Sequence, residues 1–459
     1  RYETQLMSFL DLLDDDVTQY ITNNSQKTIV TKYSPLYLWG GRTATTNETM
    51  FEDYMNLTNP TDNSPIIEVD SYEKFYKMIA GCNVVIDMIG DVDGEEKTKK
   101  RVEGEARILR SFYYFNLVNI YAYPYNAPNA PEGKSAGVPL KLNSTIDQTS
   151  IPRSTVAEVY NTIISDVEKG INLLTEVNAT GSKFRIGIST AHLLASRYYL
   201  FMENWEKVVE HATAVFSAPG NSHSLFDMTN VNYPNAINTG GFPHPFTLNN
   251  PEILFFYASE EEHEVVTSDY YAKCFMASDQ LRNCYSNEDQ RWNGYLCPYG
   301  EAGDEKKSSK FARELKFGAC LRLSEAYLNR AEAYIMTEDY TSALKDLNSY
   351  YSKRVDNYSS RTNTVTDATI AKYKARSIVD PCYTLNDKQA LYLSALADIR
   401  QLEFLEEGLR WFDVRRFNIE VTHMSYDEKI KDVLKKGDPR RIVQIPSQAR
   451  SLGLTPNPR

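Results

Sequence analysis

The sequence has no apolar stretch that approaches the roughly 20 residues a transmembrane helix needs. Its longest apolar run, from Phe112 to Tyr123, is interrupted by Asn116 and Asn119. A basic surplus is missing too, because the 459 residues carry a net charge of -11. Binding to nucleic acid depends on a basic surface that releases counterions, so this charge argues against a nucleic-acid partner. It equally disfavours direct adhesion to anionic lipid headgroups.

Cysteine is scarce, and the six that occur show no CxxC spacing. A chain this long with six cysteines is not a disulfide scaffold. We predict buried free thiols, which is the usual state of unpaired cysteine. A disulfide among Cys274, Cys284 and Cys297 is the alternative in an oxidising compartment.

Common catalytic and metal-binding patterns are absent as well. The sequence contains no GxSxG elbow and no glycine-rich phosphate loop. Its six histidines never occur at metal-ligand spacing, and His192 and His211 fall in predicted helices, where we interpret them as packing residues. We therefore predict no catalytic residues, no cofactor and no metal.

An acidic run near the start invites a calcium interpretation: Asp11, Asp14, Asp15 and Asp16. The run lacks the alternating ligands and the central glycine of a calcium loop. We predict that it forms a solvated helix face, and calcium binding stays the alternative.

Tyrosine is abundant, with 32 residues against 19 phenylalanines and 4 tryptophans. Many tyrosines recur at helical spacing, which predicts that they pack between helices. In residues 102–121 apolar side chains follow one another at steps of three and four on two faces. A helix that is apolar on two sides lies between neighbouring helices, as in a stacked array.

Two segments of the chain resemble each other in their helical pattern. In each, small and aromatic residues on one helix are followed, after a short break, by an aromatic and small or aliphatic residues on the next. The positions are Ala191, Leu194, Ala195, Tyr198, Trp205, Val208, Val209 and Ala212, and then Tyr327, Arg330, Ala331, Tyr334, Tyr340, Ala343, Leu344 and Leu347. This pattern predicts tetratricopeptide-like helix pairs and hence an all-α fold.

We predict one domain over residues 1–459, built from a helical scaffold and irregular segments. Long irregular segments are rare in compact domains unless they carry function, so they are where we expect the ligand face. The scaffold covers approximately 72–121, 156–216 and 321–355, the irregular segments approximately 30–70 and 217–320, and a C-terminal region 398–459.

Four motifs in order resemble the SusD/RagB family. They are EARILRSFYYFNLV from Glu105, GVPL from Gly137, PRSTVAEVY from Pro152 and IRQLEFLEEGLRWFDVRR from Ile399, with a closing Ile445-Pro and Asn457-Pro. The resemblance implies a SusD-like fold and a surface-exposed lipoprotein of the outer membrane in Bacteroidetes-type bacteria. It also implies a SusC-like TonB-dependent transporter as partner. This chain departs from the pattern in lacking the lipid-bearing N-terminal cysteine.

The C-terminal motif concentrates charge on one predicted helix. Glu403 is spaced to pair with Arg400, and Glu406 with Arg410, as neighbours on a helix do. Paired carboxylates also perform glycoside hydrolysis when a substrate lies between them. We favour the structural interpretation, which the family resemblance supports, and keep a glycosidase as a minor alternative.

Ligand contacts are expected from aromatic residues outside the repeats, because sugar rings stack on aromatic faces while polar groups bind the hydroxyls. Trp205 and Trp411 belong to the scaffold and the C-terminal motif, whereas Trp39 and Trp292 lie in loop-like sequence. For each candidate, packing against its own loop is the open alternative. The candidates are Tyr37, Trp39, Arg42, Tyr72, Asp279, Arg282, Tyr285, Trp292 and Tyr295.

Our main hypothesis is therefore non-catalytic capture of an oligosaccharide for delivery to the transporter. The second hypothesis is oligopeptide binding of the RagB type, in which backbone hydrogen bonds supply the affinity. The somewhat short chain keeps this branch open. An intracellular repeat adaptor that grips a partner in a concave groove is a third interpretation.

Overall fold

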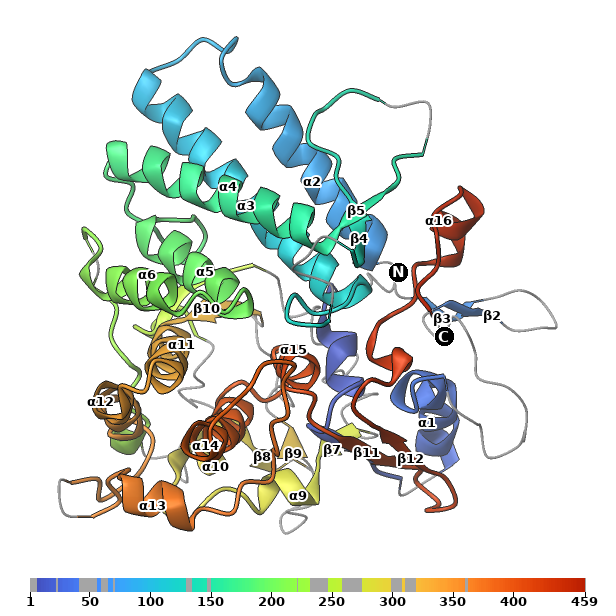
Figure 1. Ribbon diagram of the computed structural model, residues 1–459, viewed down its shortest axis with the longest axis vertical. Coiled ribbons are helices and arrows are strands. Elements are labelled where there is room, and N and C mark those ends of the chain that lie inside the picture. The colour runs from blue at the N-terminus through green and yellow to red at the C-terminus, as the bar shows by residue number, and fades with distance from the viewer. Residues whose placement is uncertain are drawn as a thin grey trace.

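Helical hairpins dominate the computed structural model (Figure 1). It describes residues 6–21, 24–40, 56–58, 65–68, 71–128, 134–146, 150–220, 222–231, 247–257, 275–298, 308–309, 319–359 and 362–458. In these ranges no helix is long and apolar enough to cross a membrane.

Seven helices form the scaffold, and each packs on the next along the chain. The first hairpins stand at the top of Figure 1, and the later ones follow below them at the left. The helices are α2 (Ser71–Met88), α3 (Glu96–Tyr121), α4 (Val156–Glu176), α5 (Ile188–Phe201), α6 (Trp205–Ser217), α11 (Leu323–Met336) and α12 (Tyr340–Tyr351). The predicted all-α, tetratricopeptide-like fold is confirmed.

The two similar segments form the hairpins α5–α6 and α11–α12, which meet through α6 and α11. Their turns have the same construction. A glutamate in the left-handed region, Glu203 in one and Glu338 in the other, precedes an N-cap residue. The side chains of Asn204 and Asp339 accept a hydrogen bond from the third residue of the following helix. Such caps satisfy backbone N–H groups that a helix start leaves unpaired.

The contact between α3 and α4 depends on two glycines. A Cβ atom at Gly170 would lie 2.7 Å from Ile108 Cδ1, and one at Gly104 would lie 3.0 Å from Leu174 Cγ. Side chains at either position would therefore push the helices apart. Arg110 of α3 also pairs with Asp166 of α4 at 2.7 Å, and both side chains are buried. Close backbone approach and a buried ion pair together hold this helix pair.

Short strands join distant parts of the chain. In the part of the chain that the structure describes they form six antiparallel two-stranded sheets. The pairs are β1 (Val17–Gln19) with β7 (Phe275–Ala277), β2 (Asn56–Thr58) with β3 (Pro65–Glu68), β4 (Ala136–Pro139) with β5 (Arg153–Thr155), β6 (Ile253–Phe256) with β10 (Cys320–Arg322), β8 (Cys297–Pro298) with β9 (Ser308–Ser309), and β11 (Val421–Met424) with β12 (Lys431–Leu434). The β1–β7 sheet connects the irregular segment over residues 217–320, which we call the middle segment, to the N-terminal segment that precedes α1. The β6–β10 sheet connects the middle segment to the scaffold.

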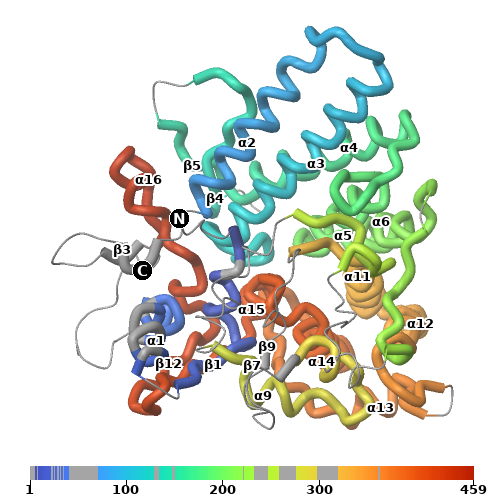
Figure 2. The backbone as a smooth tube through the Cα atoms, turned by 180° about the vertical axis from the view of Figure 1, so that it is seen from behind, coloured from blue at the N-terminus to red at the C-terminus, as the bar shows by residue number. Residues whose placement is uncertain are grey.

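The remaining helices lie around the C-terminal region and on the lower face in Figure 1. They are η1 (Ser8–Leu12), α1 (Asn24–Tyr37), η2 (Met228–Asn230), α9 (Asp279–Arg282), α10 (Gln290–Tyr295), α13 (Asp367–Lys372), α14 (Asp387–Glu403), α15 (Arg410–Arg416), η4 (Pro439–Arg441) and α16 (Ser447–Ser451). Figure 2 shows from behind that α15 lies near the centre, beside the N-terminal segment.

Two local predictions are wrong. The C-terminal charge motif is not one helix, because α14 ends at Glu403 and the chain turns through left-handed Glu406 and Gly408 before α15. The acidic run is not a solvated helix face either. It crosses η1, a turn and the start of the approach to β1, and Asp11, Asp14 and Asp16 are buried.

Candidate functional site

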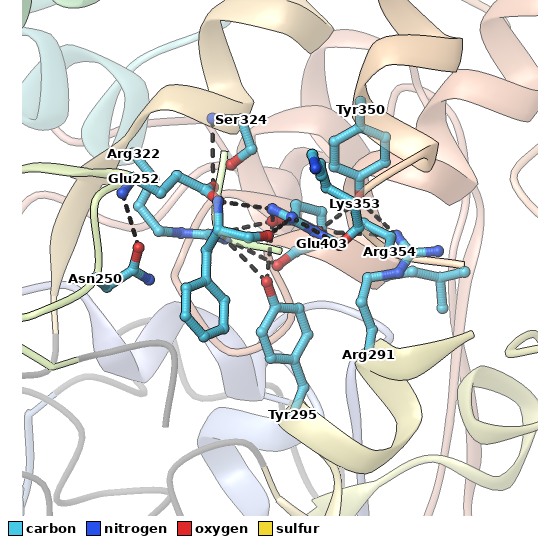
Figure 3. Close-up of polar contacts among 12 residues, drawn as sticks. Asn250, Glu252, Arg291, Tyr295, Arg322, Ser324, Tyr350, Lys353, Arg354 and Glu403 are labelled. Atoms are coloured by element: carbon cyan, nitrogen blue, oxygen red, sulfur yellow. Dashed lines mark hydrogen bonds and ion pairs between the residues drawn. The ribbon is translucent and has the colours of Figure 1, made fainter. Parts of the chain in front are cut away.

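A buried cluster of charges lies where the scaffold, the middle segment and α14 meet (Figure 3). Arg322 Nη1 lies 2.6 Å from Glu403 Oε1, and Arg354 Nη2 lies 2.9 Å from the same oxygen. Glu252 contacts both arginines, at 3.1 and 2.8 Å. We call it the carboxylate–guanidinium cluster, and its members are Glu252, Arg322, Arg354, Glu403 and Glu407.

The predicted ion pairs of the C-terminal motif are therefore wrong in their partners. Arg400 pairs with Asp413 at 2.8 Å, and Arg410 pairs with Asp15 at 2.7 Å. The physical reason is the end of α14 at Glu403, which removes the regular helical spacing on which the prediction depended. The carboxylate of Glu403 instead faces arginines that come from other parts of the chain.

The carboxylate–guanidinium cluster does not have the properties of a hydrolytic site. Burial acts to raise the pKa of Glu403, but the guanidinium groups of Arg354 and Arg322 outweigh it and hold the pKa well below its usual value. A general acid needs the opposite shift, together with access for a substrate. The side chain of Glu403 is fully buried, and Tyr295 and Tyr350 donate hydrogen bonds to it. The arrangement cross-links three parts of the fold.

Among the predicted ligand residues, Tyr37 and Trp39 stack on the two faces of His423. The ring centroids are 4.0 Å and 4.2 Å from that of the histidine, and the ring planes are nearly parallel. Trp39 is 1% exposed, and its Nε1 donates to the carbonyl oxygen of Leu13 at 2.8 Å. Packing thus accounts for both rings in this structure, and neither presents an open face to a ligand.

Tyr72 is also buried, between Tyr76 and Tyr121 at centroid distances of 4.9 and 5.0 Å. Arg42 lies outside the residues that the structure describes. The described candidates from the early part of the chain, Tyr37, Trp39 and Tyr72, therefore have no exposed side chain. This outcome favours the packing alternative for these aromatic residues.

In the middle segment the candidates divide by exposure. Tyr285 is buried and donates to the carbonyl oxygen of Leu402 at 2.9 Å, and Tyr295 donates to Glu403 at 3.0 Å. Packing and hydrogen bonding account for these two tyrosines. Asp279 is 73% exposed and forms an ion pair with Arg282, while Trp292 is half-buried and meets the Tyr285 ring edge-on.

The prediction did not include Tyr373, an aromatic residue that follows α13 and is 40% exposed. Its hydroxyl donates to Asp398 at 3.0 Å, and burial and Asp398 raise the pKa of Tyr373, with a smaller contribution from Cys284, just after α9. Cys284 and Trp292 pack on the same small group of buried residues. No spacing in the sequence connects Tyr373 to α9, because the two are joined only by folding.

We call Asp279, Arg282, Trp292 and Tyr373 the α9–α13 face. Both elements lie along the lower edge of the molecule in Figures 1 and 2. Here an exposed carboxylate, its guanidinium partner, whose side chain is 10% exposed, and two partly exposed aromatic rings occur on short helices and their ends. Such a combination provides stacking surface together with hydrogen-bonding groups.

Four of the cysteines are thiols, as predicted, but only Cys82 and Cys320 are buried, whereas Cys284 is half-buried and Cys382 is exposed. None of these four forms a disulfide, so Cys284 takes no part in the disulfide considered above. Burial raises the pKa of Cys284, which keeps its thiol protonated. Cys274 lies outside the described residues.

The fold defines a helical-repeat protein, and its interior contains a network of paired charges. Two family models match the sequence, one described as starch-binding associating with outer membrane over residues 3–200, and one described as SusD family over residues 230–451. The chain belongs to the SusD/RagB family. Members of this family are binding proteins, and they are generally lipoproteins on the surface of the outer membrane.

Solved structures show the same fold along the whole chain. A SusD superfamily protein from Bacteroides thetaiotaomicron has a TM-score of 0.73 and 21% identity, covering 100% of this chain and 95% of its own. A putative sugar binding protein from Bacteroides vulgatus has a TM-score of 0.71 and 21% identity, with coverages of 99% and 93%. A laminarin binding SusD-like protein has a TM-score of 0.64 and 17% identity, with coverages of 100% and 95%. No curated protein matches the sequence.

Proposed function

We propose that this protein binds an oligosaccharide at the cell surface without catalysis and delivers it to a SusC-like TonB-dependent transporter. The observation that carries the proposal is the similarity of the whole chain to proteins described as sugar binding and laminarin binding. The absence of a usable catalytic carboxylate in the carboxylate–guanidinium cluster supports the non-catalytic part.

We place the oligosaccharide on the α9–α13 face. The half-buried ring of Trp292 and the exposed ring of Tyr373 would stack on sugar C–H groups, while Asp279 and Arg282 would bind hydroxyl groups. The ion pair between Asp279 and Arg282 orients both polar groups before a ligand arrives. Short helices fix these side chains more firmly than a free loop would.

The test is titration calorimetry with laminarin and starch oligosaccharides on the wild type, Trp292→Ala and Tyr373→Ala. Loss of a stacking ring should weaken binding at least about fivefold, because such contacts contribute roughly 1 kcal/mol or more each. Phe184→Ala is the matched control, since Phe184 is an exposed aromatic between α4 and α5. Equal affinity of the wild type and all three variants would show that the oligosaccharide binds elsewhere on the protein.

A peptide ligand of the RagB type is the second candidate. The net charge of -11 and the exposed carboxylate of Asp279 suit a basic or neutral oligopeptide as well as a sugar. Mass spectrometry of the protein purified from its native host separates the two candidates. A ladder of co-purified peptides would replace the oligosaccharide, and a co-purified glycan would exclude the peptide.

The tip of the α2–α3 hairpin is our proposal for a contact with the transporter. Val84, Met88 and Val92 are each about half exposed there, at 45%, 55% and 51%. Clustered apolar side chains on a surface commonly mark a protein interface. Met88→Glu should reduce co-purification of the transporter from solubilised outer membranes, while leaving oligosaccharide affinity unchanged.

A further inference from the structure

Three aspartates near the start of the chain meet in the interior. Asp11, Asp14 and Asp16 are fully buried, and one carboxylate oxygen from each lies within 4.8 Å of the others. We call these three residues the aspartate cluster. The intervening Asp15 points away from it, toward Arg410 and Arg376 at 2.7 and 3.2 Å.

Backbone and amide donors satisfy only part of the aspartate cluster. Gly408 N donates to Asp11 Oδ1, and Glu406 N donates to Asp16 Oδ2, at 3.0 and 3.1 Å. Asp16 N donates to Asp14 Oδ1 at 3.0 Å. No basic side chain pairs with Asp14 or Asp16 among the ion pairs of the described residues. Two of the three buried carboxylates, those of Asp14 and Asp16, therefore lie close together without an ion-pair partner among the described residues.

Two buried oxygens point to a missing partner. Within the part of the chain that the structure describes, Asp14 Oδ2 and Gln401 Oε1 have no hydrogen-bond partner. Gln401 is 1% exposed, and its Nε2 donates to Asp16 Oδ1 at 2.8 Å, so this carboxamide is directed at the cluster. Leaving buried oxygens unpaired costs free energy unless another group satisfies them.

The electrostatics agree with the geometry. Burial and the neighbouring charges of Asp16, Asp11 and Asp15 raise the pKa of Asp14 well above its usual value. Burial and the charge of Asp15 raise the pKa of Asp16 to about 6. Near neutral pH Asp16 is therefore largely ionised although it is buried. Arg410 and Arg376 pair with Asp15, so the ion pairs of the described residues do not neutralise Asp14 and Asp16.

We propose that the aspartate cluster binds one calcium ion, beside the carboxamide of Gln401. Calcium takes six to eight oxygen ligands at about 2.3–2.6 Å, so opposite ligands lie roughly 4.6–5.2 Å apart, which accommodates the observed oxygen spacing. Magnesium requires a smaller octahedron and usually keeps several waters, which a fully buried site disfavours. The cluster contains no cysteine or histidine ligand, so it does not suit zinc.

The site would fasten two distant segments together. Asp11 and Asp16 already contact the turn between α14 and α15 through the amides of Gly408 and Glu406. Gln401 comes from the last turn of α14. A bound calcium ion would replace repulsion among the aspartates by shared coordination, and so stabilise the N-terminal segment against the C-terminal motif.

The experiment uses the full chain, stripped with chelator and then titrated with CaCl2 or MgCl2 in a calorimeter. We expect one calcium per chain and much weaker magnesium binding. Melting temperature should rise by at least about 2 °C at saturating calcium, because binding only to the folded state stabilises it. Asp14→Asn should lose both effects, while the control with Asp91→Asn and Asp93→Asn, two exposed aspartates after α2, should retain them.

Terbium luminescence gives a second measurement, because Trp39 lies beside Leu13 and can sensitise a bound lanthanide. Asp11→Asn serves if Asp14→Asn fails to fold. No calcium binding by the wild type would overturn the proposal. Calcium binding that survives both single substitutions would also overturn it, since the ion would then lie elsewhere.

Discussion

The carboxylate–guanidinium cluster and the aspartate cluster are equally buried but differ in their partners. In the first, Glu252, Glu403 and Glu407 alternate with Arg322 and Arg354 at distances of 2.6–3.1 Å. In the second, the guanidinium groups of Arg376 and Arg410 pair with Asp15 rather than with the three clustered aspartates. A buried charge is tolerated when it is paired and hydrogen-bonded, and is costly otherwise. Pairing, rather than burial, therefore distinguishes a structural cluster from a candidate ligand site.

The largest expected effect is from breaking the paired cluster. Arg354→Ala leaves Glu403 and Glu252 buried with half of their compensation, which should cost about 3–5 kcal/mol of unfolding free energy. Urea denaturation followed by circular dichroism measures it. A loss below about 1 kcal/mol would show that water or another side chain replaces the guanidinium group, and that the cluster is less tightly paired than its distances indicate.

At the aspartate cluster, we expect a substitution to raise the unfolding free energy rather than lower it. In calcium-free buffer at pH 7.5, Asp14→Asn removes a buried charge. The new amide group can also donate a hydrogen bond to a neighbouring carboxylate. The variant should be more stable than the wild type by about 1–2 kcal/mol. The same urea experiment measures it, and saturating calcium should reverse the order. A destabilised variant in calcium-free buffer would mean that the carboxylate of Asp14 is already compensated.

The two clusters should also respond differently to pH. The pKa of Asp16 in the folded protein, about 6, lies above its ordinary value of 3.8, so its contribution makes the calcium-free protein more stable as pH falls from 7 toward 4. The pKa of Glu403 in the folded protein lies below its ordinary value of 4.5, so its contribution is fully present above that value and is lost only at lower pH.

Glu203 and His192 titrate in the same window, since burial raises the pKa of Glu203 to about 7 and lowers that of His192 to about 4. The difference in unfolding free energy between the wild type and Asp16→Asn isolates the contribution of Asp16. Between pH 7 and 5 the wild type should gain about 1 kcal/mol relative to the variant. Parallel stability curves for the two proteins would contradict the raised pKa.

The smallest effect is expected at an exposed ion pair whose distance matches those in the carboxylate–guanidinium cluster. Lys207 and Glu210 lie 2.7 Å apart on α6, with side chains 40% and 55% exposed. Glu210→Ala should change the unfolding free energy by no more than about 0.5 kcal/mol, because water screens such pairs. Thermal melts of Glu210→Ala and Arg354→Ala, measured side by side, check this expectation. A large loss here would remove the distinction between buried and exposed pairs.

The helix pairs could be predicted because their signal is local. Small and aromatic residues at three- and four-residue steps recur in α5–α6 and in α11–α12, and the structure forms those hairpins. The short strands and helices between residues 217 and 320 could not be predicted. Strands of two to four residues, such as β6 and β8, are too short to show a period, and their pairing partners lie far along the chain.

The candidate site was predicted less well for a related reason. An aromatic residue in loop-like sequence has the same appearance whether its ring faces a ligand or another part of the fold. Trp39 is covered because His423, almost four hundred residues later, stacks on it. Tyr373 is exposed beside α9, although nothing in its neighbourhood in the sequence indicates a ligand. Asp279, Arg282 and Trp292 stay predictions that the binding experiment tests.

Helical periodicity and residue size, both read along the chain, determined the all-α scaffold and its repeated hairpins. Charge partners were decided only by the tertiary structure. Glu403 meets Arg322 and Arg354 instead of Arg400, and the aspartates expected in solvent are buried against the turn that precedes α15. Helix geometry depends on neighbours within four residues, whereas the energy of a buried charge depends on whichever groups folding brings within about 4 Å. The sequence contains both kinds of information, but only the first is local.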